Sequence, residues 1–242
     1  MVAETVVSAR YADPVTRYGH FALGRPHEYG RLVVSTSAGR ELSLHLPEDE
    51  VFEDRVPRLV TLAAGEPTEI LAIVSQRHSG ARLALFKLVA GRLELSARSQ
   101  AIQTPMRWLN PVGVADLDGD GRAEIAAVIT PHVGGTLKVY RKEGDELREI
   151  DALAGFSNHV FGSAELGLSA PIERAGRTQL LVPDNSRRWL HTIALEGGRL
   201  TDKGRCPLPE PATGALQVDA DGGVSIGLAS GLRHRVAGDC LR

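Results

Sequence analysis

Short apolar runs and polar clusters alternate along the whole chain. The runs are rich in Val, Ile and Leu, and clusters of Gly, Pro and Asp interrupt them at intervals of about ten residues. Such spacing is typical of short β-strands joined by tight turns. No long segment has the 3.6-residue apolar period of an amphipathic helix. The pattern therefore predicts an all-β protein.

The strand pattern also repeats. Three aligned copies are "LVTLAAGEPTEILAIVS" (Leu59–Ser75), "GVADLDGDGRAEIAAVIT" (Gly113–Thr130) and "LSAPIERAGRTQLLVPD" (Leu168–Asp184). A second strand and a glycine turn follow each copy, and Glu69, Glu124 and Gln179 share one repeat position at equal intervals. Two weaker copies lie at His20–Leu46 and Gly214–Gly238. A regular period of this kind indicates an array of similar supersecondary units.

Five units of about four antiparallel strands, arranged radially, predict a single five-bladed β-propeller over residues 1–242. The approximate blades are residues 20–56, 57–104, 107–154, 165–208 and 213–242. The last unit lacks a fourth strand, and we expect the N-terminal strand, residues 4–10, to supply it and close the ring. A β-sandwich is the alternative all-β fold, but it does not account for the regular repeat.

The segment "VADLDGDGRAEI" has the spacing of a cation-binding loop. Its predicted ligands are the backbone carbonyl of Arg122 and the carboxylates of Asp116, Asp118, Asp120 and Glu124. Counted from the first, the carboxylates occupy positions one, three, five and nine, and the carbonyl occupies position seven. Gly121 at position six permits a sharp turn, and Ca²⁺ requires about six to eight oxygen ligands. An EF-hand would end with Glu at position twelve before a helix, whereas position twelve here is Ala127 in a predicted strand.

This segment resembles the calcium-loop signature of FG-GAP or VCBS-type repeats, Asp-x-Asp-Gly-Asp-Gly-x-x-Glu, between the first two strands of a blade. The resemblance implies a propeller whose acidic loops bind Ca²⁺, as in exported bacterial proteins and in adhesion or carbohydrate-linked contexts. The corresponding stretches "AAGEPTE", "PIERAGRTQ" and "DADGG" lack the full ligand set. We therefore expect one Ca²⁺, with a structural role, because nothing in the loop requires an open coordination position.

The remaining turns of the predicted blades collect aromatic and polar side chains. Because strands alternate in direction, the linkers between blades lie on the face opposite the acidic loop. Five of the 11 aromatic residues fall in these linkers, and a ring beside polar groups suits a sugar or a peptide. The predicted ligand-binding residues are Trp108, Asn110, His132, Asn158, His159 and Asp184. In the alternative interpretation, the rings fill gaps between blades and the polar groups cap strand ends.

The predicted function is a calcium-stabilised, non-enzymatic binding or scaffold module for a polar ligand or a protein partner, and no catalytic residue is predicted. The alternative is a glycosidase-like, carbohydrate-active enzyme with two carboxylates from Asp13, Asp184 or the acidic run Pro47–Asp54. A zinc site at His132, His159 and Asp184 lacks a closely spaced ligand pair.

Composition limits the possible partners and locations. The 242 residues are 43% hydrophobic, enough for a full core, and the formal net charge of −2 argues against nucleic acid as a partner. No apolar run approaches the roughly 20 residues of a transmembrane helix, and we expect a monomer. Cys206 and Cys240 form either a disulfide or two buried thiols. With the family resemblance, they suggest a periplasmic or extracellular location, any signal peptide being absent from this chain.

Overall fold

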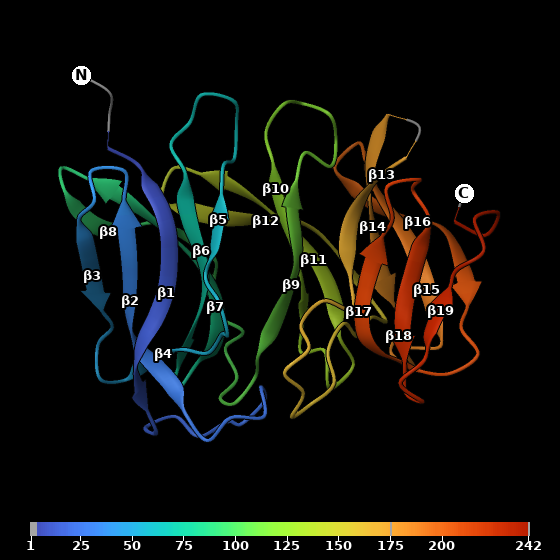
Figure 1. Ribbon diagram of the computed structural model, residues 1–242, viewed down its shortest axis with the longest axis horizontal. Coiled ribbons are helices and arrows are strands. Elements are labelled where there is room, and N and C mark those ends of the chain that lie inside the picture. The colour runs from blue at the N-terminus through green and yellow to red at the C-terminus, as the bar shows by residue number, and fades with distance from the viewer. Residues whose placement is uncertain (1–3, 175, 242) are drawn as a thin grey trace. The chain divides into compact units, whose positions relative to one another are not determined.

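The computed structural model describes residues 4–174 and 176–241. Among these residues the structure contains β-strands and no helix, and the strands form sheets of 12, four and three members. This confirms the predicted all-β class. The chain forms two compact units, unit 1 (Met1–Trp108 with Lys142–Arg148) and unit 2 (Leu109–Arg141 with Glu149–Arg242). We describe each unit by itself (Figure 1).

The N-terminal part of unit 1 contains the strands β1 (Val6–Val15), β2 (Glu28–Thr36), β3 (Glu41–His45), β4 (Glu50–Phe52), β5 (Arg58–Val60), β6 (Glu69–Gln76), β7 (Gly80–Val89) and β8 (Arg92–Arg98). Strand β6 pairs antiparallel with β4, β5 and β7, and β7 pairs with β8. In β6 every residue except the last is buried. This explains its continuous apolar sequence, because both of its faces are covered.

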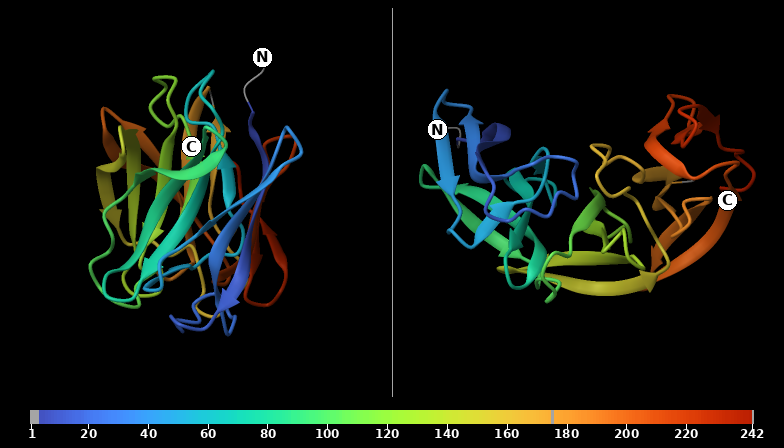
Figure 2. Two further views of the ribbon diagram at one scale, coloured as in Figure 1. Left: turned by 90° about the vertical axis from the view of Figure 1, so that its left-hand side faces the viewer. Right: turned by 90° about the horizontal axis from the view of Figure 1, so that it is seen from below.

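Within unit 1 the N-terminal strand has a partner that is close in sequence, and its predicted role in closing a ring stays a prediction. Strand β1 pairs antiparallel with β2, and the two strands lie side by side (Figures 1 and 2). The pairing buries Val6 and Tyr11 in one cluster with Leu32 and Val34 of β2. Strands close in sequence pair readily because a short connection loses little entropy. The number of blades and the boundaries of a single propeller domain stay predictions.

Unit 2 contains the strands β9 (Leu109–Ala115), β10 (Glu124–Ile129), β11 (Thr136–Glu143), β12 (Glu146–Ala154), β13 (Ala170–Arg174), β14 (Arg177–Pro183), β15 (Trp189–Glu196), β16 (Arg199–Pro207), β17 (Ala212–Val218), β18 (Val224–Leu228) and β19 (Arg233–Arg235). The end of β11, the turn after it and the start of β12, residues 142–148, belong to unit 1. Consecutive strands pair antiparallel from β9 to β11, from β13 to β16 and from β17 to β19. The acidic loop, residues 116–124, joins β9 to β10 (Figure 1).

Side chains from neighbouring sheets build the core of unit 2. One cluster packs Val128 of β10 and Val139 of β11 against Val182 of β14 and Ile193 of β15. Strand β10 is buried at every position, including its first residue, Glu124. The cluster therefore holds the strand that follows the acidic loop.

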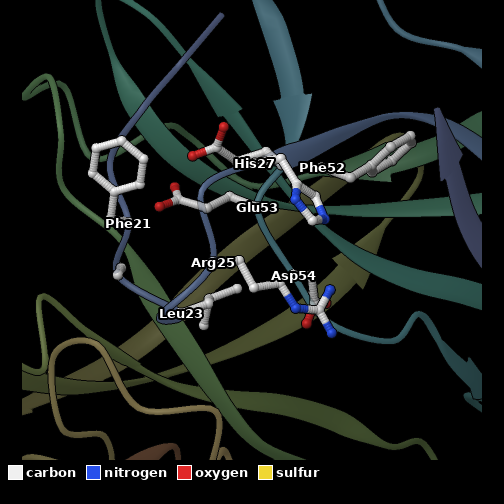
Figure 3. Close-up of a pocket in the computed structure, with 9 residues that line it drawn as sticks. Phe21, Leu23, Arg25, His27, Phe52, Glu53 and Asp54 are labelled. Atoms are coloured by element: carbon white, nitrogen blue, oxygen red, sulfur yellow. The ribbon is translucent and has the colours of Figure 1, made fainter. Parts of the chain in front are cut away.

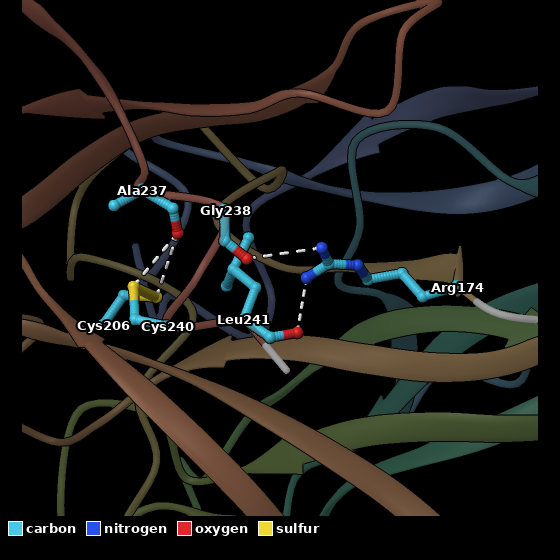
Figure 4. Close-up of a disulfide and its surroundings, with 6 residues drawn as sticks. All are labelled: Arg174, Cys206, Ala237, Gly238, Cys240 and Leu241. Carbon is cyan, nitrogen blue, oxygen red and sulfur yellow. Dashed lines mark hydrogen bonds between the residues drawn. A yellow bond between two sulfur atoms is a disulfide. The ribbon is translucent and has the colours of Figure 1, made fainter.

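A disulfide joins Cys206 at the end of β16 to Cys240 (Figure 4), with 5.3 Å between the two Cα atoms. Arg174 of β13 donates hydrogen bonds to the backbone carbonyls of Leu241 and Gly238. The last residues of the described chain are therefore tied to both β13 and β16.

Among the residues that the structure describes, no helix is long and apolar enough to cross a membrane.

Candidate functional site

Three aspartates converge in the acidic loop. Asp116, Asp118 and Asp120 each offer a carboxylate oxygen, and these oxygens lie within 4.8 Å of one another. They are the first three of the predicted ligands. Gly121 has a φ of 87°, in the left-handed region that a residue with a Cβ adopts only with strain. The glycine at position six therefore allows the backbone turn that gathers the carboxylates.

Backbone N–H groups of the loop surround the first carboxylate. Asp116 Oδ1 accepts hydrogen bonds from Gly119 N at 2.8 Å and Asp120 N at 3.1 Å, and Oδ2 accepts one from Gly121 N at 2.9 Å. Three donors within the loop thus fix its conformation through one side chain. A carboxylate has about four lone-pair positions, so Asp116 keeps acceptor capacity beyond these bonds.

The predicted fourth carboxylate lies deeper than the aspartates. Glu124 is 0% exposed at the start of β10, and its Oε2 accepts a hydrogen bond from Leu117 N at 2.9 Å. Burial raises the pKa of Glu124 by penalising its charged form, while its hydrogen bonds to Arg141 and Leu117 act in the opposite direction. Arg122 is exposed, and its backbone N–H donates to Asp120 Oδ1 at 2.8 Å.

Arg141 is a member of this site that our sequence reasoning missed. Its Nη2 lies 2.6 Å from Asp118 Oδ2, 2.6 Å from Glu124 Oε1 and 3.6 Å from Asp120 Oδ2. Tyr140 of β11 pairs with Ile125 of β10 in an antiparallel register. Arg141, which follows Tyr140, is therefore a neighbour of Glu124, which precedes Ile125. These carboxylates raise the pKa of Arg141, and the hydrogen bond to Glu124 has the largest effect. Only the strand register reveals the pairing.

The charges of the acidic loop favour an additional cation. The guanidinium of Arg141 contacts three of the four carboxylates, so ionised carboxylates leave an excess of negative charge. Oxygen ligands from Asp116, Asp118 and Asp120 suit a hard divalent ion such as Ca²⁺, and the last two aspartates are reachable from solvent. The residues present therefore fit the ion that the family resemblance implies.

A reduced form of the same arrangement occurs between β17 and β18. Arg235 lies 3.1 Å from Asp219 Oδ2 and 3.2 Å from Asp221 Oδ2, and its side chain is 62% exposed. As with Arg141, the arginine comes from the third strand of its repeat and faces the loop between the first two. This loop has two carboxylates in place of four, and one exposed arginine balances half of their charge.

Two of the predicted ligand-binding residues are interior amides of unit 2. Asn110 Nδ2 donates to the carbonyls of Asn158 and Leu166, at 3.2 and 2.9 Å. Asn158 Nδ2 donates in return to Asn110 O at 3.1 Å and to Ser169 Oγ at 3.0 Å. Both asparagines are 0% exposed. They fasten the segment after β12 to β9 and have no exposed surface for a ligand.

The two predicted histidines bond to each other. His159 is 0% exposed, and its Nε2 lies 3.1 Å from Ser163 O. A carbonyl can only accept, so this nitrogen carries the proton and Nδ1 accepts from His132 Nε2 at 2.7 Å. Burial lowers the pKa of His159 to about 4, which keeps its ring neutral. Within the described residues, no group of three possible metal ligands includes either histidine.

The remaining two predicted ligand residues also have structural partners. Asp184 caps a turn, because its Oδ1 accepts hydrogen bonds from Arg188 N at 3.0 Å and Trp189 N at 3.1 Å. In unit 1, Trp108 is 1% exposed and its Nε1 donates to Glu53 O at 2.8 Å. A ring buried to this extent offers no face on which a sugar can stack. Burial therefore gives the predicted ligand face no support.

The carboxylates of the enzyme alternative are engaged as well. Asp13 pairs with Arg31 at 2.9 Å. At the end of the acidic run, Glu53 and Asp54 are each 2% exposed. Their hydrogen-bond partners are His20 and Ser75 for Glu53, and Tyr11, Arg55 and Arg58 for Asp54. These contacts stabilise unit 1 and assign no catalytic role.

No protein-family model matches the chain, and no curated protein matches it. Among solved structures, the chain is similar to one described as a putative 6-phosphogluconolactonase from Bacteroides fragilis NCTC 9343. The sequence identity is 13% and the TM-score is 0.44, over 86% of this chain and 65% of that chain. The chain thus spans slightly less than two thirds of the length of that protein.

Proposed function

We propose that the acidic loop binds one Ca²⁺ and that the protein is a calcium-stabilised binding or scaffold module without catalytic activity. The observation that carries this proposal is the convergence of the Asp116, Asp118 and Asp120 oxygens within 4.8 Å. The match of "DLDGDGRAE" to the FG-GAP or VCBS signature supports the same ion. These three aspartates would hold the cation, with Glu124 and the carbonyl of Arg122 as further ligands.

The bound ion would supply positive charge between strands β9 and β10. Four carboxylates within nine residues repel one another, and a divalent cation converts that repulsion into attraction. The strands on either side of the loop are buried in the core cluster of unit 2. The proposed role is therefore support for the sheet that carries the loop.

We place this module in a five-bladed propeller of the FG-GAP or VCBS type, in the periplasm or outside the cell. The repeating strand pattern supports the propeller, and the disulfide between Cys206 and Cys240 supports an oxidising compartment. The proposed partner is a polar ligand, carbohydrate or peptide, or another protein.

Calcium titration of the metal-free protein tests the ion. Isothermal titration calorimetry with Ca²⁺ should give one site, and Ca²⁺ should raise the melting temperature above that in EDTA. Asp118→Ala should remove most of this difference, because Asp118 is the predicted ligand at position three. Asp221→Ala, in the two-carboxylate loop, is the matched control and should keep the full calcium response.

An unchanged melting temperature in EDTA, with no heat of Ca²⁺ binding, would show that the loop is a metal-free turn. A calcium response of equal size in Asp118→Ala would place the ion elsewhere on the protein.

A further inference from the structure

The small pocket of unit 1, which Figure 3 shows, has room for about one water molecule. Its charged side chains have partners within unit 1. Asp54 lies 2.6 Å from Arg58, and Arg25 donates a hydrogen bond to Tyr29 Oη at 2.7 Å. A partner molecule therefore finds little to bind in this pocket, and the sheet edges of unit 1 are the more open surfaces.

Strand β3 of unit 1 has one unpaired edge. It pairs antiparallel with β2, beside which it lies in Figure 1, and within the described chain it pairs with no other strand. The register runs without interruption from Arg31 opposite His45 to Ser35 opposite Glu41. An edge of this kind presents backbone N–H and C=O groups to which another strand can bond. The edge of β3 is therefore a candidate interaction surface.

The hydrogen bonds to β2 show which residues of β3 face the open edge. Just after the strand, Leu46 N donates to Gly30 O at 2.9 Å, and this bond fixes the phase of the ladder. Hydrogen-bonded pairs occupy every second position of an antiparallel ladder, so the residues of β3 that bond to β2 are Leu42 and Leu44. The other three residues of the strand direct their N–H and C=O groups away from β2. They are Glu41, Ser43 and His45.

Two other strands at sheet edges carry features that oppose pairing with a second chain. Strand β1 contains Pro14, which has no N–H group, and Asp13, which has a φ of 57°. Strand β19 carries Arg233 and Arg235, so a second copy of β19 would bring arginines together. Strand β3 contains no proline, and its ladder with β2 has no register shift. Its edge is thus regular and open to another strand.

A second copy of β3 fits this edge in an antiparallel register centred on Ser43. Ser43 of one copy then faces Ser43 of the other, and Glu41 of each copy faces His45 of the other. Every N–H group that points outward meets an outward C=O group. The next possible registers would place His45 opposite Gly39 of the preceding turn, or Glu41 opposite Pro47. The register centred on Ser43 therefore forms the most backbone hydrogen bonds.

Polar side chains on one face of the sheet complement each other in this register. The side chains of Glu41 and His45 are 61% and 66% exposed. Glu41 lies 3.2 Å from Arg10, and His45 Nδ1 lies 3.9 Å from Asp13 Oδ2. Between the two copies, each Glu41 carboxylate gains an imidazole that can donate a hydrogen bond to it. Cross-strand pairs of this kind stabilise a sheet.

Apolar side chains complement each other on the opposite face. Leu42 and Leu44 lie half-buried against the core cluster of unit 1. In the register centred on Ser43, Leu42 of one copy faces Leu44 of the other, and symmetry repeats the pair. Pairing would therefore remove apolar surface of both copies from water. The edge of β3 is thus self-complementary in its backbone and on both faces.

We propose that two copies of the protein associate through their β3 edges, in the antiparallel register centred on Ser43, and thereby join their sheets. A second copy suits this edge better than an unrelated extended segment, because the edge complements itself in backbone bonds, polar pairs and apolar side chains. The proposed interface lies in unit 1 and is independent of the calcium site in unit 2. The dimer replaces the monomer that we expected from the sequence.

Sedimentation velocity of the full chain at increasing concentration tests the dimer. The apparent mass should rise from 25.9 kDa towards twice that value. Ser43→Pro should keep the mass of the monomer over the same range, because proline removes the central N–H group and blocks the edge. This N–H group does not bond to β2, so the variant keeps its ladder within unit 1. Ser43→Ala retains the N–H group, is the matched control and should dimerise like the original protein.

Glu41→Lys tests the register. Because the dimer loses both contacts between a Glu41 carboxylate and a His45 imidazole, the dissociation constant should rise by about tenfold. Glu66→Lys changes an exposed glutamate outside β3 and should leave the constant unchanged.

Ser43→Cys gives an independent test should Ser43→Pro fail to fold. The Cα atoms of a hydrogen-bonded pair lie about 5.5 Å apart, a distance that a disulfide can span. Mild oxidation should therefore link two copies of this variant covalently. Ser186→Cys, at an exposed serine of unit 2, is the control and should stay largely unlinked.

Three results would overturn the proposal. One is a protein that stays monomeric at every concentration, whatever other peptide its edge binds. Another is a dimer that persists in Ser43→Pro, because it would form through a different surface. The third is equal cross-linking of Ser43→Cys and Ser186→Cys, or a dissociation constant that Glu41→Lys leaves unchanged.

Discussion

Arg141 Nη2 lies 2.6 Å from Glu124 Oε1, so the first residue of β10 carries its own counter-cation from β11. Glu124 is fully buried and the Arg141 side chain is 26% exposed. The same guanidinium contacts Asp118 and Asp120. Arg141 therefore links a buried carboxylate to the acidic loop and neutralises part of its charge.

Arg141→Met should destabilise the protein by about 2–3 kcal/mol in EDTA, because it leaves Glu124 buried without its charge partner. Ca²⁺ should then raise the melting temperature of the variant by more than that of the original protein. Thermal melts in EDTA and in Ca²⁺ measure both effects. Arg122→Ala removes an exposed arginine of the same loop and should change stability by less than about 0.5 kcal/mol. Equal stability of the two variants in EDTA would contradict this role of Arg141.

Trp108 should contribute stability through both its ring and its N–H group. Trp108→Phe removes the hydrogen bond to Glu53 O and should cost about 1–2 kcal/mol, because a buried carbonyl loses its donor. Trp108→Ala should cost about 3–5 kcal/mol through loss of packing. Urea denaturation measures both. Trp189→Phe, at a half-buried tryptophan stacked with Arg205, is the control. A small effect of Trp108→Ala would return Trp108 to the set of candidate ligand residues.

His159 should lower the stability of the protein in acid. Its pKa of about 4 lies below the ordinary value of about 6.5, so the folded state favours the neutral ring. The stabilisation is complete above about pH 6.5 and is lost as the pH falls through 4, on the order of 3 kcal/mol in all. Imidazole NMR should show a His159 ring that stays neutral at pH 5. Titration of His159 near pH 6.5 would contradict its buried placement.

The disulfide should stabilise the C-terminal part of the protein. Cys206 and Cys240 are separated by 34 residues, and closing a loop of this length is worth about 3–4 kcal/mol. Cys206→Ser with Cys240→Ser should lower the urea midpoint, and a reducing agent should lower that of the original protein to the same extent. Hydrogen exchange should show residues 236–241 opening in both cases. A midpoint insensitive to reduction would show that the disulfide contributes little.

The predictions that held depend on residues close together in the sequence. Alternating apolar runs and turn residues predicted the all-β class, because a strand and its turns are specified locally. The spacing of Asp116, Asp118 and Asp120 predicted their convergence for the same reason. A loop of nine residues, 116–124, with a glycine at position six has few ways to arrange its side chains. For such features the sequence was sufficient.

The tertiary structure decided the features that join distant residues. Pattern alone left β1 free to pair with any strand of suitable length, and its burial against β2 settled the choice. Asn158 and His159 had the composition of a binding loop, yet they are buried because β9 and the residues around Ser163 satisfy their hydrogen bonds. Arg141 reaches Glu124 only through the register of two strands. Burial and register are properties of the packed chain, and no local pattern specifies which distant groups will meet.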